Sequence, residues 1–193
     1  MPNNNIIFVT GGTGNQGGAV ARNLISSGFT VKALTRNPDS AKALDLKKLN
    51  IQLVKGDLNN AGTYREHLKD LYGIFSVQTF EDGVDKEISQ GITLATLAKE
   101  LGIKHFLYSS ALGTDLDSGI SHIDSKLKIE NHIKQSGLPF TIIRPSSLYE
   151  NFLIPQVKKG ILKGKLVQPV NGDTILQYVA AEDIGKAATK IFE

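Results

Sequence analysis

The sequence predicts an α/β fold: a Rossmann-like, doubly wound parallel sheet followed by a small C-terminal α/β lobe. The main observation is that short apolar runs alternate with helical patterns six times between residues 6 and 143. Such alternation is typical of βαβ units, which join parallel strands through right-handed crossovers. The second observation is size and composition, since 193 residues with 40% hydrophobic and 21% charged residues can bury a sizeable core.

A glycine-rich turn follows the first expected strand, residues 6–9, and opens the first helical pattern. Gly11 allows a sharp turn out of the strand, Gly14 lets a pyrophosphate approach the backbone, and Gly17 lets the helix pack close to the strand. The helix start offers free N–H groups and a partial positive charge to phosphates. A plain flexible turn is the alternative, but the strand before it and the helix after it favour a dinucleotide site.

The other elements of the main sheet follow from apolar runs and from helix start and stop signals. The first helix ends at Ser26-Ser27-Gly28. Further strands are expected at residues 30–35, 51–54, 73–77, 105–109 and 140–143. Asn37 is the expected N-cap of a short second helix, with Pro38 at its first position. Further helices are expected at 64–68, 85–101 and 121–135.

The regular alternation of strand and helix patterns ends after Pro145. We expect a helix at residues 151–159, a strand at 166–167, a turn at Asn171-Gly172, a strand at 175–179 and a closing helix from Glu182. An Asn-Gly pair between apolar runs predicts a hairpin, although Pro169 directly after the first run weakens this prediction. The chain thus divides into a dinucleotide-binding region, residues 1–145, and a small second lobe, 146–193, within one compact domain.

Composition limits the classes of function. No apolar run approaches the length of a membrane span, and the first residues lack the basic and apolar segments of a secretory signal. The absence of cysteine excludes disulfides and thiolate chemistry, and we expect no metal site. A net charge of +3 is too small to argue for nucleic-acid binding. We therefore expect a cytoplasmic protein, with a nuclear location as the alternative, and no membrane or direct nucleic-acid partner.

Ligands of a doubly wound sheet bind outside the carboxyl ends of its strands, so the residues that follow each strand are the candidates. Arg36 follows the second strand, where an acidic residue would select NAD and an arginine suits the 2′-phosphate of NADP. The alternative is a solvated surface arginine. Asp57 and Leu58 follow the third strand, where Asp57 can accept a hydrogen bond from the adenine amine. Residues 78–80 follow the fourth strand, beside the expected pyrophosphate and ribose.

Several segments together resemble the NmrA-like family of atypical short-chain dehydrogenases/reductases. They are Thr10–Gly17, Thr35–Pro38, Gly56–Leu58, Ser125-Lys126, Arg144-Pro145, Leu148–Phe152 and Val179–Gly185, in the family's order. With the glycine turn, the resemblance implies binding of NADP(H), preferred over NAD(H). It implies contacts from Gly11, Gly12, Thr13, Gly14, Asn15, Gln16, Gly17, Arg36, Asn37, Asp57, Leu58, Gln78, Thr79, Phe80, Lys126, Leu148, Tyr149, Glu150 and Asn151.

The chain departs from this resemblance at the catalytic pair. Typical short-chain dehydrogenases use Tyr-x-x-x-Lys, in which the lysine lowers the tyrosine pKa and the tyrosine passes a proton to or from the substrate oxygen. Here the pair reads His122-x-x-x-Lys126. We expect Lys126 to hold the nicotinamide ribose, while His122 is either a proton relay or an exposed helix-start histidine. Ser109, Ser110 or Ala111 stands at the place of the usual serine.

The chain also departs in length. Family members usually carry a further C-terminal segment that completes a small substrate-covering domain, whereas this chain stops at Glu193. We expect either a truncated chain or a minimal lobe, and in both cases a less complete exclusion of water from the nicotinamide. A cluster of lysines in the second lobe, Lys158, Lys159, Lys163 and Lys165, is interpreted as a solvated surface rather than as a partner site.

Three functions remain open. The missing tyrosine favours a redox sensor that binds NADP(H) and regulates a protein partner, as the resemblance implies for NmrA-like sensors. The alternative is an enzyme, an NADPH-dependent reductase of quinones or small carbonyls. Quinones need less acid catalysis than carbonyls because hydride transfer to them gives a stabilised phenolate-type product. A third interpretation is a cofactor-binding scaffold without signalling.

Overall fold

The computed structural model describes residues 5–116, 119–168 and 170–193. A six-stranded, entirely parallel sheet forms its centre, in the order β3-β2-β1-β4-β5-β6. The strands are β1 (Ile6–Val9), β2 (Thr30–Thr35), β3 (Gln52–Lys55), β4 (Gly73–Ser76), β5 (His105–Ser109) and β6 (Phe140–Ile143). The predicted doubly wound sheet is confirmed. Because the strand order reverses between β1 and β4, the switch point at which such sheets bind ligands lies at that junction.

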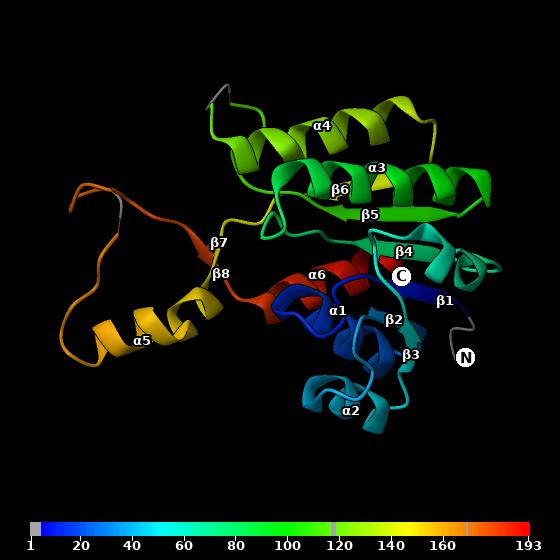
Figure 1. Ribbon diagram of the computed structural model, residues 1–193, viewed down its shortest axis with the longest axis horizontal. Helices are drawn as coiled ribbons and strands as arrows, with labels where there is room; N and C mark the ends of the chain where they lie inside the picture. Colours follow the sequence, from blue (N-terminus) through cyan, green and yellow to red (C-terminus); the bar gives the residue numbers. More distant parts are fainter. Residues whose placement is uncertain (1–4, 117–118, 169) are drawn as a thin grey trace.

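Helices cover both faces of the sheet (Figure 1). One face carries α1 (Asn15–Ser26), α2 (Ala41–Lys48) and α6 (Ala181–Phe192), and the other carries α3 (Val84–Glu100) and α4 (Ser121–Gln135). Alternation along β1 explains this division, because successive side chains of a strand point to opposite faces. Ile7 and Val9 pack with Leu24 of α1, whereas Phe8 packs with Leu94 of α3.

The last helix, α6, closes the core of the main sheet. A Cβ at Gly185 would lie 2.8 Å from the backbone oxygen of Ala19, so α6 and α1 approach each other backbone to backbone. At the other end of α6, Phe192 packs so tightly over β4 that a Cβ at Gly73 would lie 2.6 Å from its ring. The second lobe is therefore interleaved with the first region, since its closing helix belongs to the main core.

Two helix predictions for the first region are wrong in detail. An α-helix is expected at residues 64–68, but a 3₁₀ turn, Arg65–Leu68, forms there. It follows another 3₁₀ turn, Ala61–Thr63. The side chain of Asn60 accepts from the Gly62 N–H, and such local bonds compete with a regular helix. The second helix, α2, begins at Ala41 rather than Pro38, because Ser40 is its N-cap and accepts from the Ala43 N–H at 3.4 Å.

The predicted hairpin of the second lobe is also wrong. The two strands that the second lobe does form, β7 (Ser147–Leu148) and β8 (Tyr178–Val179), pair in parallel. The turn after Asn171 forms, with the Thr174 N–H donating to the Asn171 oxygen, but it joins no strands. Of the strand expected at residues 175–179 only Tyr178–Val179 forms, as β8. Val167 and Ile175 are 90% and 93% exposed, so these parts of the expected strands have no surface on which to bury their side chains. Pro169, which bears on this prediction, lies outside the described residues.

The rest of the second lobe projects away from the sheet (Figure 1). It comprises a 3₁₀ segment, η3 (Tyr149–Leu153), and the short helix α5 (Pro155–Ile161), where one helix was expected from residue 151. Pro155 explains the break, because a proline disfavours helical geometry in the residue before it and suits the first turn of a helix. The four clustered lysines of this lobe, Lys158, Lys159, Lys163 and Lys165, are exposed. Within the described ranges, no helix is both long enough and apolar enough to span a membrane.

Candidate functional site

The glycine turn between β1 and α1 has the conformation that its spacing predicts. Gly11 has a φ of +60°, a conformation that side-chain-bearing residues rarely adopt. The Gly14 N–H donates to the Gly11 oxygen at 2.8 Å, which closes the turn. A Cβ at Gly17 would lie 2.3 Å from the Thr10 oxygen, so only glycine lets α1 approach β1 this closely. The turn therefore presents the start of α1 at the carboxyl end of the sheet.

Two side-chain contacts tie this turn to the neighbouring strand ends. The Thr10 hydroxyl donates to the Val77 oxygen at 2.9 Å and accepts from the Val77 N–H at 2.8 Å, across the switch point. The Ser109 hydroxyl donates to Oε1 of Gln16 at 2.7 Å, which joins the end of β5 to the first turn of α1. Sequence reasoning missed this structural role of Thr10, although a threonine directly before the first glycine was a visible signal.

A cleft of about 160 Å³ lies on the β1–β2–β3 side of the switch point, and we call it the β1–β3 cleft. It brings together some of the predicted contacts that follow each of these strands and β4. Its lining comprises Gly11, Thr13, Leu34, Thr35, Arg36, Gly56, Asp57, Leu58, Asn59, Val77, Gln78, Thr79, Asp82 and Gln90. Four strand ends that are far apart in sequence, those of β1, β2, β3 and β4, thus contribute to one concave surface.

Arg36 stands at the outer rim of the β1–β3 cleft. Its side chain is 73% exposed, and its Nη1 lies 3.7 Å from Oδ2 of Asp82, which lines the same cleft. A second hollow adjoins it, lined by Thr13, Thr35, Arg36, Asn37, Ser40, Ala41 and Lys42. Lys42 adds a second cation that sequence reasoning missed, and its place in the first turn of the helix after β2 was the available signal.

A buried acceptor in the β1–β3 cleft tests whether a dinucleotide fits there. Gln78 is only 6% exposed, and its Nε2 donates to the Ser76 hydroxyl at 2.9 Å. Among the described residues, no donor reaches its Oε1. An unmet buried acceptor is costly, and a ribose hydroxyl or an adenine amine would supply the missing donor. With the glycine turn and the two cations at the rim, the residues present fit NADP(H).

A larger cleft, of about 570 Å³, lies on the β4–β5–β6 side, and we call it the β4–β6 cleft. The rings of Phe80 and His122 stack in its wall, with centroids 4.8 Å apart. The lining is Phe80, Ala111, Leu112, His122, Ile123, Pro145, Ser146, Ser147, Leu148, Asn151, Ile175, Leu176 and Gln177. Of the three candidates for the serine position, Ala111 lines this cleft, whereas Ser109 is buried and bonded to Gln16.

Lys126 lies between α3 and α4, and it is not among the described residues that line either cleft. Its ammonium is 2.8 Å from Oε1 of Glu87 on α3, and the Ser125 hydroxyl donates to Oε2 of the same carboxylate at 2.5 Å. Glu87 is fully buried, and the Lys126 side chain is 11% exposed. Sequence reasoning missed Glu87. Its signal was position, because Glu87, Gly91 and Leu94 share the buried stripe of α3.

A second buried carboxylate anchors the wall of the β4–β6 cleft. Glu130 of α4 is fully buried and accepts from Nε and Nη2 of Arg144, from Lys134 and from the Thr114 hydroxyl. Burial alone would raise the pKa of Glu130, but hydrogen bonds, chiefly from Arg144, outweigh it and lower the pKa to about 2. Arg144 directly precedes Pro145 and Ser146, which line the cleft, so this ion pair holds that wall on α4.

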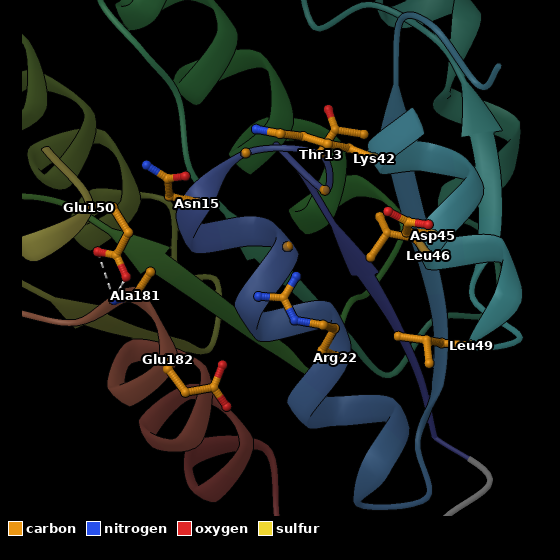
Figure 2. Close-up of a pocket in the computed structure, with 13 residues that line it drawn as sticks. Thr13, Asn15, Arg22, Lys42, Asp45, Leu46, Leu49, Glu150, Ala181 and Glu182 are labelled. Atoms are coloured by element: carbon orange, nitrogen blue, oxygen red, sulfur yellow. Dashed lines mark hydrogen bonds between the residues drawn. The ribbon is translucent and has the colours of Figure 1, made fainter. Parts of the chain in front are cut away.

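Tyr149 and Glu150, two further predicted cofactor contacts, lie in the second lobe. Tyr149 stacks on Tyr178, with ring centroids 5.4 Å apart. The Glu150 carboxylate accepts from the Ala181 N–H at 3.0 and 3.2 Å and so caps α6. Figure 2 shows this contact in a groove over α1, on the side of the glycine turn that faces α2 and α6. Within the described ranges, no cluster of three or more His, Cys, Asp or Glu residues could hold a metal ion.

Comparison with known proteins gives consistent matches along the chain. A model of the NmrA-like family matches residues 3–193. An NmrA-like family domain-containing protein of Dictyostelium discoideum is 37% identical over 135 residues, which are 67% of this chain and 45% of that protein. The NAD(P)H azoreductase of Xenophilus azovorans is 29% identical over 187 residues, which are 96% of this chain and 62% of the azoreductase.

A solved structure agrees with the fold. NmrA, a negative transcriptional regulator solved in complex with NADP, matches with a TM-score of 0.82 and 26% sequence identity. The match covers 98% of this chain and 62% of NmrA. The chain thus spans between about half and two thirds of the length of these three proteins.

Proposed function

The chain belongs to the NmrA-like family, and on this premise we propose that it binds NADP(H) and reduces a planar quinone-type or aromatic acceptor. One observation carries the proposal: two clefts lie at the carboxyl edge of the sheet, one on each side of the switch point, and they differ in chemistry. The β1–β3 cleft has the glycine turn and Arg36, and Lys42 lines the hollow that adjoins it, whereas the β4–β6 cleft has an apolar wall with stacked rings. The first suits the adenosine and phosphates, and the second suits a nicotinamide with a flat acceptor beside it.

The residues of the β1–β3 cleft account for binding and orientation. The start of α1 offers backbone N–H groups and a partial positive charge to the pyrophosphate. Arg36 and Lys42 supply cations for the 2′-phosphate, which supports a preference for NADP(H) over NAD(H). Oε1 of Gln78 accepts from a ribose or adenine donor. The NADP complex of NmrA and the name of the Xenophilus azoreductase support a nicotinamide cofactor.

The residues of the β4–β6 cleft account for the acceptor. NADPH, when bound, supplies a hydride to the acceptor. Phe80, Leu112 and Leu148 offer apolar surface to a ring. His122, held against Phe80, can donate a proton to the reduced acceptor, and solvent in this open cleft can do the same. Because a quinone delocalises the charge that it receives, the absent tyrosine is not needed for this class of acceptor.

A redox sensor is the second candidate, and one observation favours it. The family's tyrosine position holds His122, and Lys126 is paired with the buried Glu87, so the usual proton-transfer pair is missing. A protein that binds NADP(H) without turnover would then signal its redox state to a protein partner. NmrA, described as a negative transcriptional regulator, supports this alternative.

Turnover separates the two candidates. Purified protein is titrated calorimetrically with NADPH and NADP, and then incubated with NADPH and a series of quinones, azo dyes and aldehydes while absorbance at the NADPH band is followed. Many turnovers per protein with quinones or azo dyes support the reductase. Binding of both cofactor forms without turnover supports the sensor, and failure to bind either form overturns both functions.

A further inference from the structure

We propose that Glu87 is a positioning residue for the cofactor: its buried carboxylate holds Lys126 at the α3–α4 interface, where the ammonium can serve the nicotinamide ribose. The inference rests on the proposed binding of NADP(H) and adds a residue that neither the sequence patterns nor the comparisons assign. Its basis is a pair of contacts between α3 and α4, the helix whose first turn lines the β4–β6 cleft.

Both oxygens of the Glu87 carboxylate are bound by consecutive residues of α4. Oε1 accepts from the Lys126 ammonium at 2.8 Å, and Oε2 accepts from the Ser125 hydroxyl at 2.5 Å. Because Glu87 is fully buried, its charge needs this counter-ion, and loss of one partner would leave an uncompensated charge in the interior. The ammonium is therefore confined to one position in the folded protein.

The next turn of each helix holds the two elements in register. Gly91 lies one turn after Glu87 on α3, and Ile129 lies one turn after Ser125 on α4. A Cβ at Gly91 would be 2.7 Å from the Ile129 side chain, so the helices touch at this point and cannot slide without a clash. The carboxylate thus stands at a fixed place relative to the first turn of α4, which carries His122.

This arrangement leaves part of the Lys126 ammonium for a ligand. An ammonium has three donors, and one of them is directed to Glu87. The Lys126 side chain keeps 11% exposure, and it lies one helical turn after His122, which lines the β4–β6 cleft. A lysine side chain loses considerable rotamer freedom when it binds a ligand, and Glu87 removes most of that freedom beforehand. The prearranged ammonium should therefore strengthen only the binding of the nicotinamide half of the cofactor, and not that of the adenosine half.

A fragment of the cofactor makes this testable without any activity measurement. Adenosine 2′,5′-bisphosphate contains the 2′-phosphate but lacks the nicotinamide ribose, so Lys126 cannot contribute to its binding. Calorimetry with NADPH and with this fragment is carried out on the wild type, Glu87→Gln, Lys126→Met and the double variant. Glu100→Gln is the matched control, since Glu100 ends the same helix but pairs with Arg65 at the surface.

We expect Glu87→Gln and Lys126→Met each to weaken NADPH binding roughly tenfold and to leave fragment binding within about twofold. The double variant should be no weaker than either single variant, because both substitutions remove the same prearranged contact. Glu100→Gln should bind both ligands as the wild type does. Thermal unfolding checks the fold, and if Glu87→Gln is unstable, Glu87→Asp, which keeps the charge but draws it back from Lys126, should give a smaller loss of the same kind.

Three results would overturn the inference. If Glu87→Gln weakens the binding of NADPH and of the fragment equally, Glu87 has a structural role only. If it changes the affinity for neither ligand, Glu87 has no role in cofactor binding. If the wild type binds neither ligand, the failure lies with the proposed function and not with Glu87. Additive losses in the double variant would show that Glu87 does not act through Lys126, which also overturns it.

Discussion

Arg144 binds Glu130 through two parallel hydrogen bonds, with Nε at 2.9 Å and Nη2 at 2.7 Å from the two oxygens of a fully buried carboxylate. This pair joins the end of β6 to the middle of α4, the two elements that form one wall of the β4–β6 cleft. Bidentate arginine–carboxylate contacts are among the stronger and most directional hydrogen bonds in proteins. The geometry of the cleft therefore depends on the ionisation of Glu130.

The first prediction is a loss of stability in acid. The pKa of Glu130 is about 2 in the folded protein, against an ordinary value of 4.5, so the ionised form is favoured by folding. The ionised carboxylate of Glu130 therefore adds roughly 3 kcal/mol to the free energy of unfolding. This stabilisation is fully present above pH 4.5 and is lost as the pH falls toward 2. Urea unfolding between pH 2 and 7 measures it, and Glu130→Gln should flatten this part of the pH dependence.

A surface carboxylate provides the control for this experiment. Glu66 also has a lowered pKa, through its hydrogen bond with Lys69, but it is fully exposed, where solvent screens such a pair. Glu66→Gln should leave the pH dependence of stability nearly unchanged. If Glu130→Gln and Glu66→Gln give the same profile as the wild type, the Arg144–Glu130 pair does not control acid stability.

The second prediction concerns cofactor choice. A charge-assisted contact between Arg36 and the 2′-phosphate should contribute roughly 1.5–3 kcal/mol, about ten- to a hundredfold in affinity. Arg36→Ala should therefore remove most of the preference for NADP(H) while leaving NAD(H) binding nearly unchanged. Lys42→Ala should cause a smaller loss, because an ammonium makes no bidentate contact. Added salt should weaken the preference, since the Arg36 side chain is largely exposed.

Calorimetric titration of these variants with both cofactors decides the question. Equal wild-type affinities for NADP and NAD would make Arg36 a surface charge. A uniform loss for both cofactors in Arg36→Ala would instead indicate a change in the cleft as a whole, because NAD has no 2′-phosphate to lose.

The third prediction concerns the close approach of α1 to β1. A Cβ at Gly17 would lie 2.3 Å from the Thr10 oxygen and 2.4 Å from the Gly11 oxygen, both backbone atoms that cannot move aside alone. Gly17→Ala should destabilise the fold by about 1–3 kcal/mol or more and displace the start of α1 from the phosphate position. Thermal unfolding and NADPH titration measure the two effects.

Gly172→Ala is the matched control, because a Cβ at this loop position would meet no described atom within 4 Å. It should change neither stability nor NADPH binding appreciably. A Gly17→Ala variant that keeps wild-type stability and affinity would contradict the packing role of this glycine.

The sequence predicted the main sheet well for a local reason. Alternation of Ile7, Phe8 and Val9 between two apolar faces, and the glycine turn that follows, are properties of neighbouring residues. The second lobe was predicted poorly because Val167 and Ile175 look like strand residues but have no surface to cover them. Glu87 escaped prediction for a third reason, since its partners lie 38 and 39 residues away on another helix. Helical spacing could have placed Glu87 on the buried stripe of α3, but its partners depend on packing between helices that no local pattern encodes.

The last prediction separates two roles of His122 in the proposed reaction. His122→Phe keeps a ring stacked on Phe80 but cannot carry a proton, whereas His122→Ala removes both functions. A quinone delocalises the charge it receives, so turnover of quinones by His122→Phe should stay within roughly threefold of the wild type. A simple aldehyde needs a proton on its oxygen during the reaction, and any wild-type turnover of aldehydes should fall about a hundredfold or more in the same variant.

His122→Ala should lower quinone turnover further than His122→Phe, because the cleft loses half of its stacked wall. Steady-state NADPH oxidation with both acceptor classes measures these rates. A hundredfold loss of quinone turnover in His122→Phe would mean that His122 donates a proton even to quinones, and equal rates in all three proteins would place the acceptor away from this wall.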